Sequence, residues 1–132
     1  MSNNKQSSVD KDFVPYTEAL ELKELGFDEP CLATIDQTEF VHINGTEYPI
    51  RGAMYYRTID LPTFSQAFRW FREKYKIEPE ILSDMMGYVC SIVDRNKPLK
   101  TRLTPSNLFQ TYEEAELACL RKLIEIAQGG NK

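Results

Sequence analysis

The segment TYEEAELACLRKLIEIAQGG, residues 111–130, predicts a long C-terminal helix and, with it, a core in which a helix packs on a sheet. Thr111 and Glu114 have the spacing of a capping box, which satisfies backbone N–H groups at a helix start, and Gly129 and Gly130 are expected to stop the helix. Its apolar residues recur at helical spacing: Ala115, Ala118, Cys119, Leu123, Ile126 and Ala127, widened by Leu117, Leu120 and Ile124. A stripe that wide indicates a helix lying against a sheet, with a self-association surface as the alternative.

Two further helices precede this segment. Residues 18–25 carry apolar side chains at helical spacing and are followed by Gly26, where a C-terminal glycine belongs. Thr63 and Gln66 form a second capping box. An aromatic face follows it: Phe64, Ala67, Phe68, Phe71 and Tyr75. This helical segment is expected to end at Pro79.

Strand patterns are found in the rest of the chain, over residues 31–35, 39–43, 46–50, 53–59, 87–93 and 100–104. Asn44-Gly45 predicts a hairpin turn, because both central positions of a type I′ turn need a positive φ. Pro49 cannot donate a ladder hydrogen bond, so its strand is expected at an edge or to be interrupted there. We therefore predict an α+β fold, a mainly antiparallel sheet of about five strands with three helices packed on it, in the order α-β-β-β-α-β-β-α.

The length of 132 residues suits one hydrophobic core. Residues 1–12 are polar and are expected to form a flexible N-terminal tail, residues 13–128 a single α+β domain, and residues 129–132 a C-terminal tail. The apolar runs are short and the N-terminus has no h-region, which predicts no membrane span, no signal peptide and a cytoplasmic protein. Three cysteines far apart in sequence make a disulfide framework unexpected.

Three stretches carry a resemblance: residues 13–27 (FVPYTEALELKELGF), 66–75 (QAFRWFREKY) and 111–126 (TYEEAELACLRKLIEI). In their order and their residues, these stretches resemble a group of small uncharacterised proteins encoded in bacterial and bacteriophage genomes. The resemblance includes all three expected helices but not the strand region between Asp36 and Pro62. Because the group has no assigned activity, it carries over no catalytic or binding residue. It implies a prophage origin and an accessory or host-interaction role.

Catalytic and metal-binding motifs are sparse. One histidine and three separated cysteines do not supply the clustered ligands of a zinc site. His42 lies between Val41 and Ile43 in an expected strand, where an outward-facing histidine is favoured over a general base. No phosphate loop or Gly-x-Ser-x-Gly motif occurs, and the acids Glu113 and Glu114 are explained by capping and the helix dipole. We therefore expect no cofactor and no metal, and an enzyme would depend on carboxylates alone.

Positive charge is concentrated in two segments. Residues 64–76 carry four basic residues against Glu73 alone, and residues 95–102 carry four more. If the two segments met, their cations could bind phosphates while the indole stacked on a base; the residues are Arg69, Trp70, Arg72, Lys74, Lys76, Arg95, Lys97, Lys100 and Arg102. The alternative interpretation is the solvated face of an amphipathic helix, with Trp70 at the rim of the core.

Three functions therefore stay open on the sequence. The first is a non-enzymatic module that binds a protein partner or a second copy of itself, through the basic helix or the apolar stripe of the last helix. The second is a nucleic-acid-binding accessory protein, although a net charge of −4 argues against coating nucleic acid with the whole surface. The third is a carboxylate-based enzyme, which nothing in the sequence requires.

Overall fold

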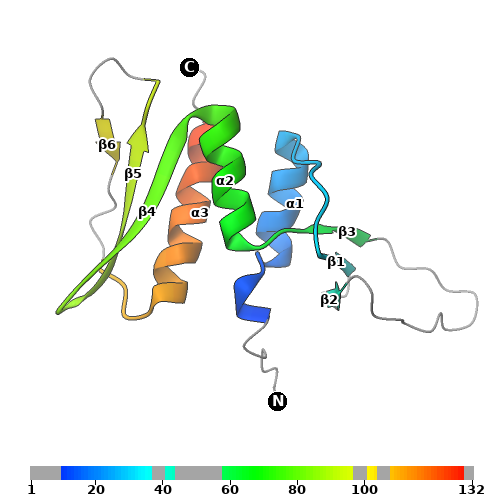
Figure 1. The fold of residues 1–132 in the computed structure, drawn as a ribbon, viewed down its shortest axis with the longest axis horizontal. Helices are drawn as coiled ribbons and strands as arrows, with labels where there is room; N and C mark the ends of the chain where they lie inside the picture. Colours follow the sequence, from blue (N-terminus) through cyan, green and yellow to red (C-terminus); the bar gives the residue numbers. More distant parts are fainter. Residues whose placement is uncertain (1–9, 37–40, 44–57, 97–100, 104–107, 130–132) are drawn as a thin grey trace, which may run out of the picture. The chain divides into compact units, whose positions relative to one another are not determined.

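The computed structural model describes residues 10–36, 41–43, 58–96, 101–103 and 108–129. Its helices are α1 (Tyr16–Leu25), α2 (Phe64–Tyr75) and α3 (Tyr112–Gly129), and a 3₁₀ turn, Asp10–Asp12, precedes them. Its strands are β1 (Ala33–Asp36), β2 (Val41–Ile43), β3 (Thr58–Leu61), β4 (Ile77–Asp84), β5 (Gly87–Asp94) and β6 (Thr101–Leu103). The chain is therefore α+β, as predicted (Figure 1).

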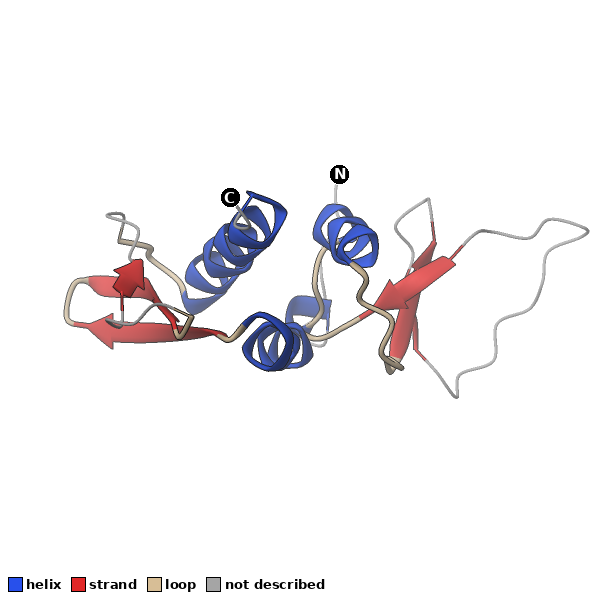
Figure 2. Cartoon of the chain, turned by 90° about the horizontal axis from the view of Figure 1, so that it is seen from above, coloured by secondary structure: helices blue, strands red, loops and turns tan. Residues whose placement is uncertain are grey.

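The chain divides into two compact units, unit 1 (Met1–Thr63) and unit 2 (Phe64–Lys132). Each unit contains a three-stranded antiparallel sheet, in the order β2-β1-β3 in unit 1 and β4-β5-β6 in unit 2 (Figure 2). The prediction of one sheet of about five strands and of its element order is not confirmed, because the described strands form two sheets and include β4, which was not predicted. The assignment of one domain over residues 13–128 with two tails stays a prediction.

Unit 1 is built on α1 and β3, which pack together. The predicted glycine stop of α1 is confirmed: Gly26 has a φ of 105°, and its N–H and that of Phe27 donate to the carbonyl oxygens of Lys23 and Leu22, each at 3.0 Å. Such a left-handed turn satisfies carbonyls that the helix end would leave unpaired. The buried apolar side chains of this unit include Val14, Ala19, Leu22, Phe27, Ala33, Ile35 and Leu61.

The strands of unit 1 differ in detail from the prediction. The strand expected over residues 31–35 is β1, which pairs with both β2 and β3. The first strand of the expected hairpin corresponds to β2, whereas its Asn44-Gly45 turn and its second strand, 46–50, lie outside the described residues. Most of the strand expected over residues 53–59 also lies outside them, and β3 begins only at Thr58.

In unit 2, β4 and β5 form a long hairpin that is in register from Ile77 opposite Asp94 to Asp84 opposite Gly87. Helix α3 packs on β4 and β5, and α2 contacts both β4 and α3 (Figure 1). Most of the apolar stripe of α3 is buried, with Ala115, Cys119, Leu120, Leu123, Ile124 and Ala127 at most 7% exposed, whereas Leu117, Ala118 and Ile126 are half-buried. The interpretation of a helix lying against a sheet is confirmed, because the buried side of the stripe packs on β4 and β5.

Helix α2 ends at Tyr75 rather than at Pro79, because Lys76 adopts a left-handed conformation with a φ of 61°. Strand β4 begins at the next residue, and Pro79 lies within it. A proline is tolerated there because β4 is an edge strand of its sheet and need not donate hydrogen bonds on both sides.

The start of α3 confirms the Thr111 cap. The Thr111 hydroxyl oxygen accepts a hydrogen bond from the N–H of Glu114 at 3.1 Å, while the Glu114 carboxylate accepts one from the N–H of Gln110 at 3.2 Å. The carboxylate therefore reaches the residue before the cap. None of the helices in the described ranges combines the length and the apolar composition that crossing a membrane requires.

Candidate functional site

The tip of the β4–β5 hairpin is a two-residue turn formed by Met85 and Met86. The Asp84 carboxylate holds the turn, because its Oδ1 accepts hydrogen bonds from the N–H groups of Met86 at 2.7 Å and Gly87 at 3.0 Å. Neither methionine has a positive φ, whereas Gly87 has a φ of 153°. The turn is thus fixed by a side-chain cap and a glycine, which leaves both methionine side chains outside the ladder.

The segment that leads into α3 is tied beside this tip. Tyr88 and Phe109 exchange two backbone hydrogen bonds of 2.8 Å, which form an isolated antiparallel bridge. The rings of Tyr88 and Tyr112 meet edge to face with their centroids 5.9 Å apart. These contacts place Leu108 and Tyr112 next to the start of β5.

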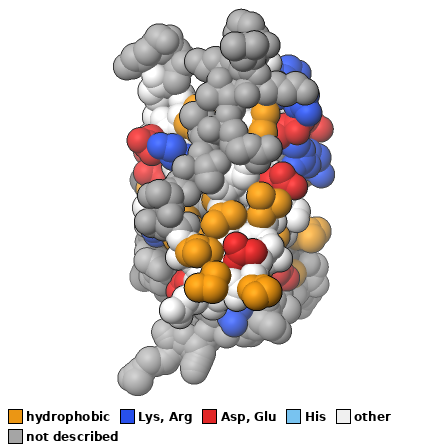
Figure 3. All heavy atoms as spheres, turned by 90° about the vertical axis from the view of Figure 1, so that its left-hand side faces the viewer, with side chains coloured by type: hydrophobic (Ala, Val, Ile, Leu, Met, Phe, Trp, Pro, Cys, Tyr) orange, Lys and Arg blue, Asp and Glu red, His pale blue; other side chains and the backbone are white. Residues whose placement is uncertain are grey.

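Apolar side chains consequently gather at one end of unit 2. The exposed fractions are 97% for Met85, 78% for Met86, 48% for Leu108, 44% for Tyr112 and 39% for Leu82. We call these five residues the methionine tip. Figure 3, which views the molecule from the side of the β4–β5–β6 sheet, shows that hydrophobic side chains also reach the surface on this side of unit 2, around an acidic one. Exposed apolar side chains that gather in one region of the surface are typical of interaction sites.

The surroundings of the methionine tip are acidic. Residues 80–90 and 108–116 contain no Lys or Arg and five acidic residues: Glu80, Asp84, Glu113, Glu114 and Glu116. Of these, Glu80, Asp84, Glu113 and Glu114 are exposed. Partial burial, together with the negative charges nearby, chiefly that of Glu116, raises the pKa of Tyr112. The end of unit 2 that carries the methionine tip therefore presents an apolar surface in a negative field.

The predicted basic helix has a different geometry from the one that stacking on a base requires. Arg69 and Arg72 are exposed on α2, as expected of its outer face. Trp70, however, is only 6% exposed and packs edge to face on Phe71 and Tyr75, with centroids 5.1 and 5.6 Å away. The Lys74 ammonium lies 5.1 Å from the centroid of the indole ring. The indole therefore presents no open face on which a base could stack.

The two predicted basic segments do meet, at the end of α2. The N–H of Arg95 donates to the Lys76 carbonyl oxygen at 2.8 Å, and the Asn96 side-chain amide donates to the Tyr75 carbonyl oxygen at 2.7 Å. The Arg95 guanidinium is held by Glu78 through bonds of 2.6 and 3.1 Å, and this carboxylate raises the pKa of Arg95. The local positive charge is therefore partly neutralised.

The remaining predicted contact residues are placed only in part. Arg102 lies in β6 opposite Val93. Lys97 and Lys100 lie outside the described residues. The structure thus joins the backbones of Lys76 and Arg95, and leaves the basic patch a prediction.

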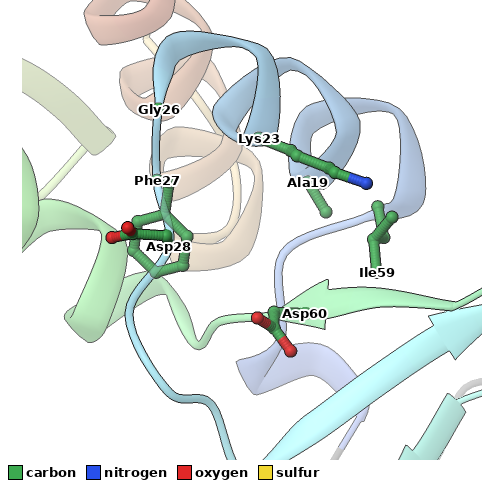
Figure 4. Close-up of a pocket in the computed structure, with 7 residues that line it drawn as sticks. All are labelled: Ala19, Lys23, Gly26, Phe27, Asp28, Ile59 and Asp60. Atoms are coloured by element: carbon green, nitrogen blue, oxygen red, sulfur yellow. The ribbon is translucent and has the colours of Figure 1, made fainter.

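Unit 1 contains a hollow of about 450 Å³ lined by Ala19, Lys23, Gly26, Phe27, Asp28, Ile59 and Asp60. Figure 4 shows that the Lys23 ammonium and the carboxylates of Asp28 and Asp60 point in different directions. An acid–base pair needs its two groups to converge on one reacting atom. Among the described residues, no three His, Cys, Asp or Glu side chains are placed to share a metal ion.

Sequence reasoning missed the methionine tip. Its signal is the segment Ser83-Asp-Met-Met-Gly87, in which two methionines occupy a turn next to the strand predicted over residues 87–93, where Asn, Asp, Gly or Ser is usual. Because β4 was not predicted, no hairpin turn was predicted at Met85 and Met86. No family model, curated protein or solved structure matches the chain.

Proposed function

We propose that this chain is a non-enzymatic interaction module, of the phage-related accessory kind that the resemblance implies, which binds a protein partner through the methionine tip. The observation that carries the proposal is the exposure of Met85 and Met86 beside Leu82, Leu108 and Tyr112. Burying a methionine side chain contributes about 1.5–3 kcal/mol, so two of them supply much of the free energy of a micromolar complex.

The partner that fits this surface is a basic, amphipathic segment of another protein. Methionine side chains are flexible and polarisable, and they suit surfaces that accept the apolar face of a helix. The acids around the tip favour Lys and Arg at the edges of that segment and speed its association. The same acids disfavour nucleic acid at this end of unit 2.

The test is fluorescence anisotropy of a labelled helical peptide made of Leu and Lys, titrated with the full chain. We expect micromolar binding to the wild type and at least tenfold weaker binding to the Met85→Ser/Met86→Ser variant, since tenfold corresponds to about 1.4 kcal/mol. Leu32→Ser is the matched control, because Leu32 is 67% exposed but belongs to unit 1. It should bind like the wild type.

A second peptide, with Glu in place of Lys, separates the charge contribution and should bind more weakly. Equal binding to the wild type and to the double methionine variant would refute the proposal. A concentration-dependent mass in sedimentation that the double variant abolishes would instead identify a second copy of the chain as the occupant. Circular dichroism spectra of the variants should match that of the wild type.

Nucleic-acid binding is the second candidate, because the Arg95–Lys76 hydrogen bond joins the two basic segments. Labelled single- and double-stranded oligonucleotides should then bind with an affinity that falls steeply with salt. The Arg69→Glu/Arg72→Glu variant should lose that affinity, whereas Met85→Ser/Met86→Ser should keep it. Absence of binding at low salt would exclude this function.

A further inference from the structure

Two of the three cysteines meet in the core of unit 2. Cys90 lies in β5 opposite Ile81, and Cys119 lies in α3, which packs on β5. Both residues are 0% exposed, and their thiols lie close enough for Cys119 to act as a hydrogen-bond donor to Cys90. Cys31 belongs to unit 1, is half-buried, and its thiol donates to the Glu29 carbonyl oxygen at 3.4 Å.

We propose that Cys90 and Cys119 form a dithiol site that small-molecule disulfides oxidise to an intrachain disulfide between β5 and α3. A disulfide forms without a large backbone movement only between cysteines whose side chains approach one another. Cys90 and Cys119 meet this condition, because their thiols interact where α3 packs on β5. The proposal is independent of the methionine tip, since neither thiol reaches the surface.

The reaction balances as two exchange steps. A Cys90 thiolate attacks one sulfur of an oxidant such as oxidised glutathione, which forms a mixed disulfide and releases one glutathione thiolate. The Cys119 sulfur then loses its proton and attacks the Cys90 sulfur, which releases the second glutathione. The protein thereby loses two protons and two electrons, and one oxidised glutathione becomes two molecules of the reduced form.

The environment assigns different roles to the two sulfurs. The hydrogen bond from Cys119 lowers the pKa of Cys90 against the effect of burial, so Cys90 is the attacking thiolate. The same hydrogen bond and burial raise the pKa of Cys119, which stays protonated until the second step. Because both thiols are buried, oxidation requires local opening of unit 2, and it should be slow in the native protein.

The experiment incubates the full chain in buffers of increasing ratio of oxidised to reduced glutathione. Free thiols are then alkylated, and non-reducing peptide mass spectrometry locates any cross-link. We expect the oxidised protein to lose the mass of two hydrogen atoms, with Cys90 linked to Cys119 and Cys31 alkylated. The disulfide should raise the thermal midpoint by about 5–10 °C, because it restricts the unfolded chain.

Cys31→Ser is the matched control and should oxidise like the wild type, whereas Cys90→Ala and Cys119→Ala should keep their remaining thiols free. If an alanine variant fails to fold, the cross-link map of the wild type still decides the question. Three alkylated thiols after oxidation, a cross-link through Cys31, or a cross-link between two chains would overturn the proposal.

Discussion

Replacing Gly87 by alanine should destabilise the part of unit 2 on which the methionine tip depends. Gly87 has a φ of 153°, a conformation that residues with a side chain rarely adopt. An added Cβ would lie 2.6 Å from the Phe109 carbonyl oxygen and 3.2 Å from Leu108 Cδ2. The first of these contacts is to a backbone atom, so a simple rotamer change cannot relieve it.

The size of the effect follows from two terms. Holding a residue other than glycine at such a φ costs on the order of 1–3 kcal/mol. If the chain moves away instead, the two hydrogen bonds between Tyr88 and Phe109 are lost, and each contributes about 1 kcal/mol. Either way, we expect Gly87→Ala to lower the free energy of unfolding by about 1–3 kcal/mol.

Urea denaturation followed by the fluorescence of Trp70, the single tryptophan, measures this change. Gly129→Ala is the matched control, because nothing lies within 4 Å of a Cβ added at Gly129. That variant should stay within about 0.5 kcal/mol of the wild type, as surface changes do. If Gly87→Ala were equally harmless, the geometry derived for the tip would be wrong.

Two further outcomes follow from side chains at the start of α3. Thr111→Ala removes the acceptor of the Glu114 N–H and should destabilise unit 2 by about 1 kcal/mol in the same denaturation assay, whereas Thr111→Ser should retain most of the stability. Because the pKa of Tyr112 is raised in the folded state, its contribution to stability is fully present below the unfolded value of about 10 and is lost as the pH rises through the folded value. The thermal midpoint should therefore fall less steeply above pH ~10 in Tyr112→Phe, and a profile unchanged from the wild type would contradict this assignment.

The local structure was predictable wherever the signal lay within one element. The Thr111 cap, the Gly26 stop and the apolar stripe of α3 depend on residues a few positions apart, and all three were identified. The β5 strand was also found, because its β-branched residues suit a central strand buried by its neighbours.

The pairing of strands was not predictable in the same way. Alternation of side chains tells which residues share a face, but it does not tell which of several strands lies alongside. Strand β4 was missed because Glu78, Pro79 and Glu80 are poor strand formers, and only its edge position makes them acceptable. The described strands therefore form two sheets of three strands each, where one sheet of about five strands was predicted.

The candidate sites also differ in whether one segment of the sequence specifies them or several elements must come together. Charge segregation along the sequence identified Lys76 and Arg95, which the structure joins. Helical periodicity also placed Trp70 at the rim of the core, and that position leaves no ring face open. The methionine tip and the pair formed by Cys90 and Cys119 depend on where β4 and α3 lie relative to β5, which no single segment specifies.

The connection between α2 and β4 is a single residue, Lys76, and it is held by its own carbonyl and by that of Tyr75. Because this connection is so short and is hydrogen-bonded, neither neighbouring element can move without the other. The last turn of α2 and the first residues of β4 should therefore open as one cooperative unit in amide hydrogen exchange. The far end of β4 carries the methionine tip. A partner that binds the methionine tip should therefore slow amide exchange in the last turn of α2, at the opposite end of β4. Exchange in this helix would then detect binding at a site that the helix does not contact.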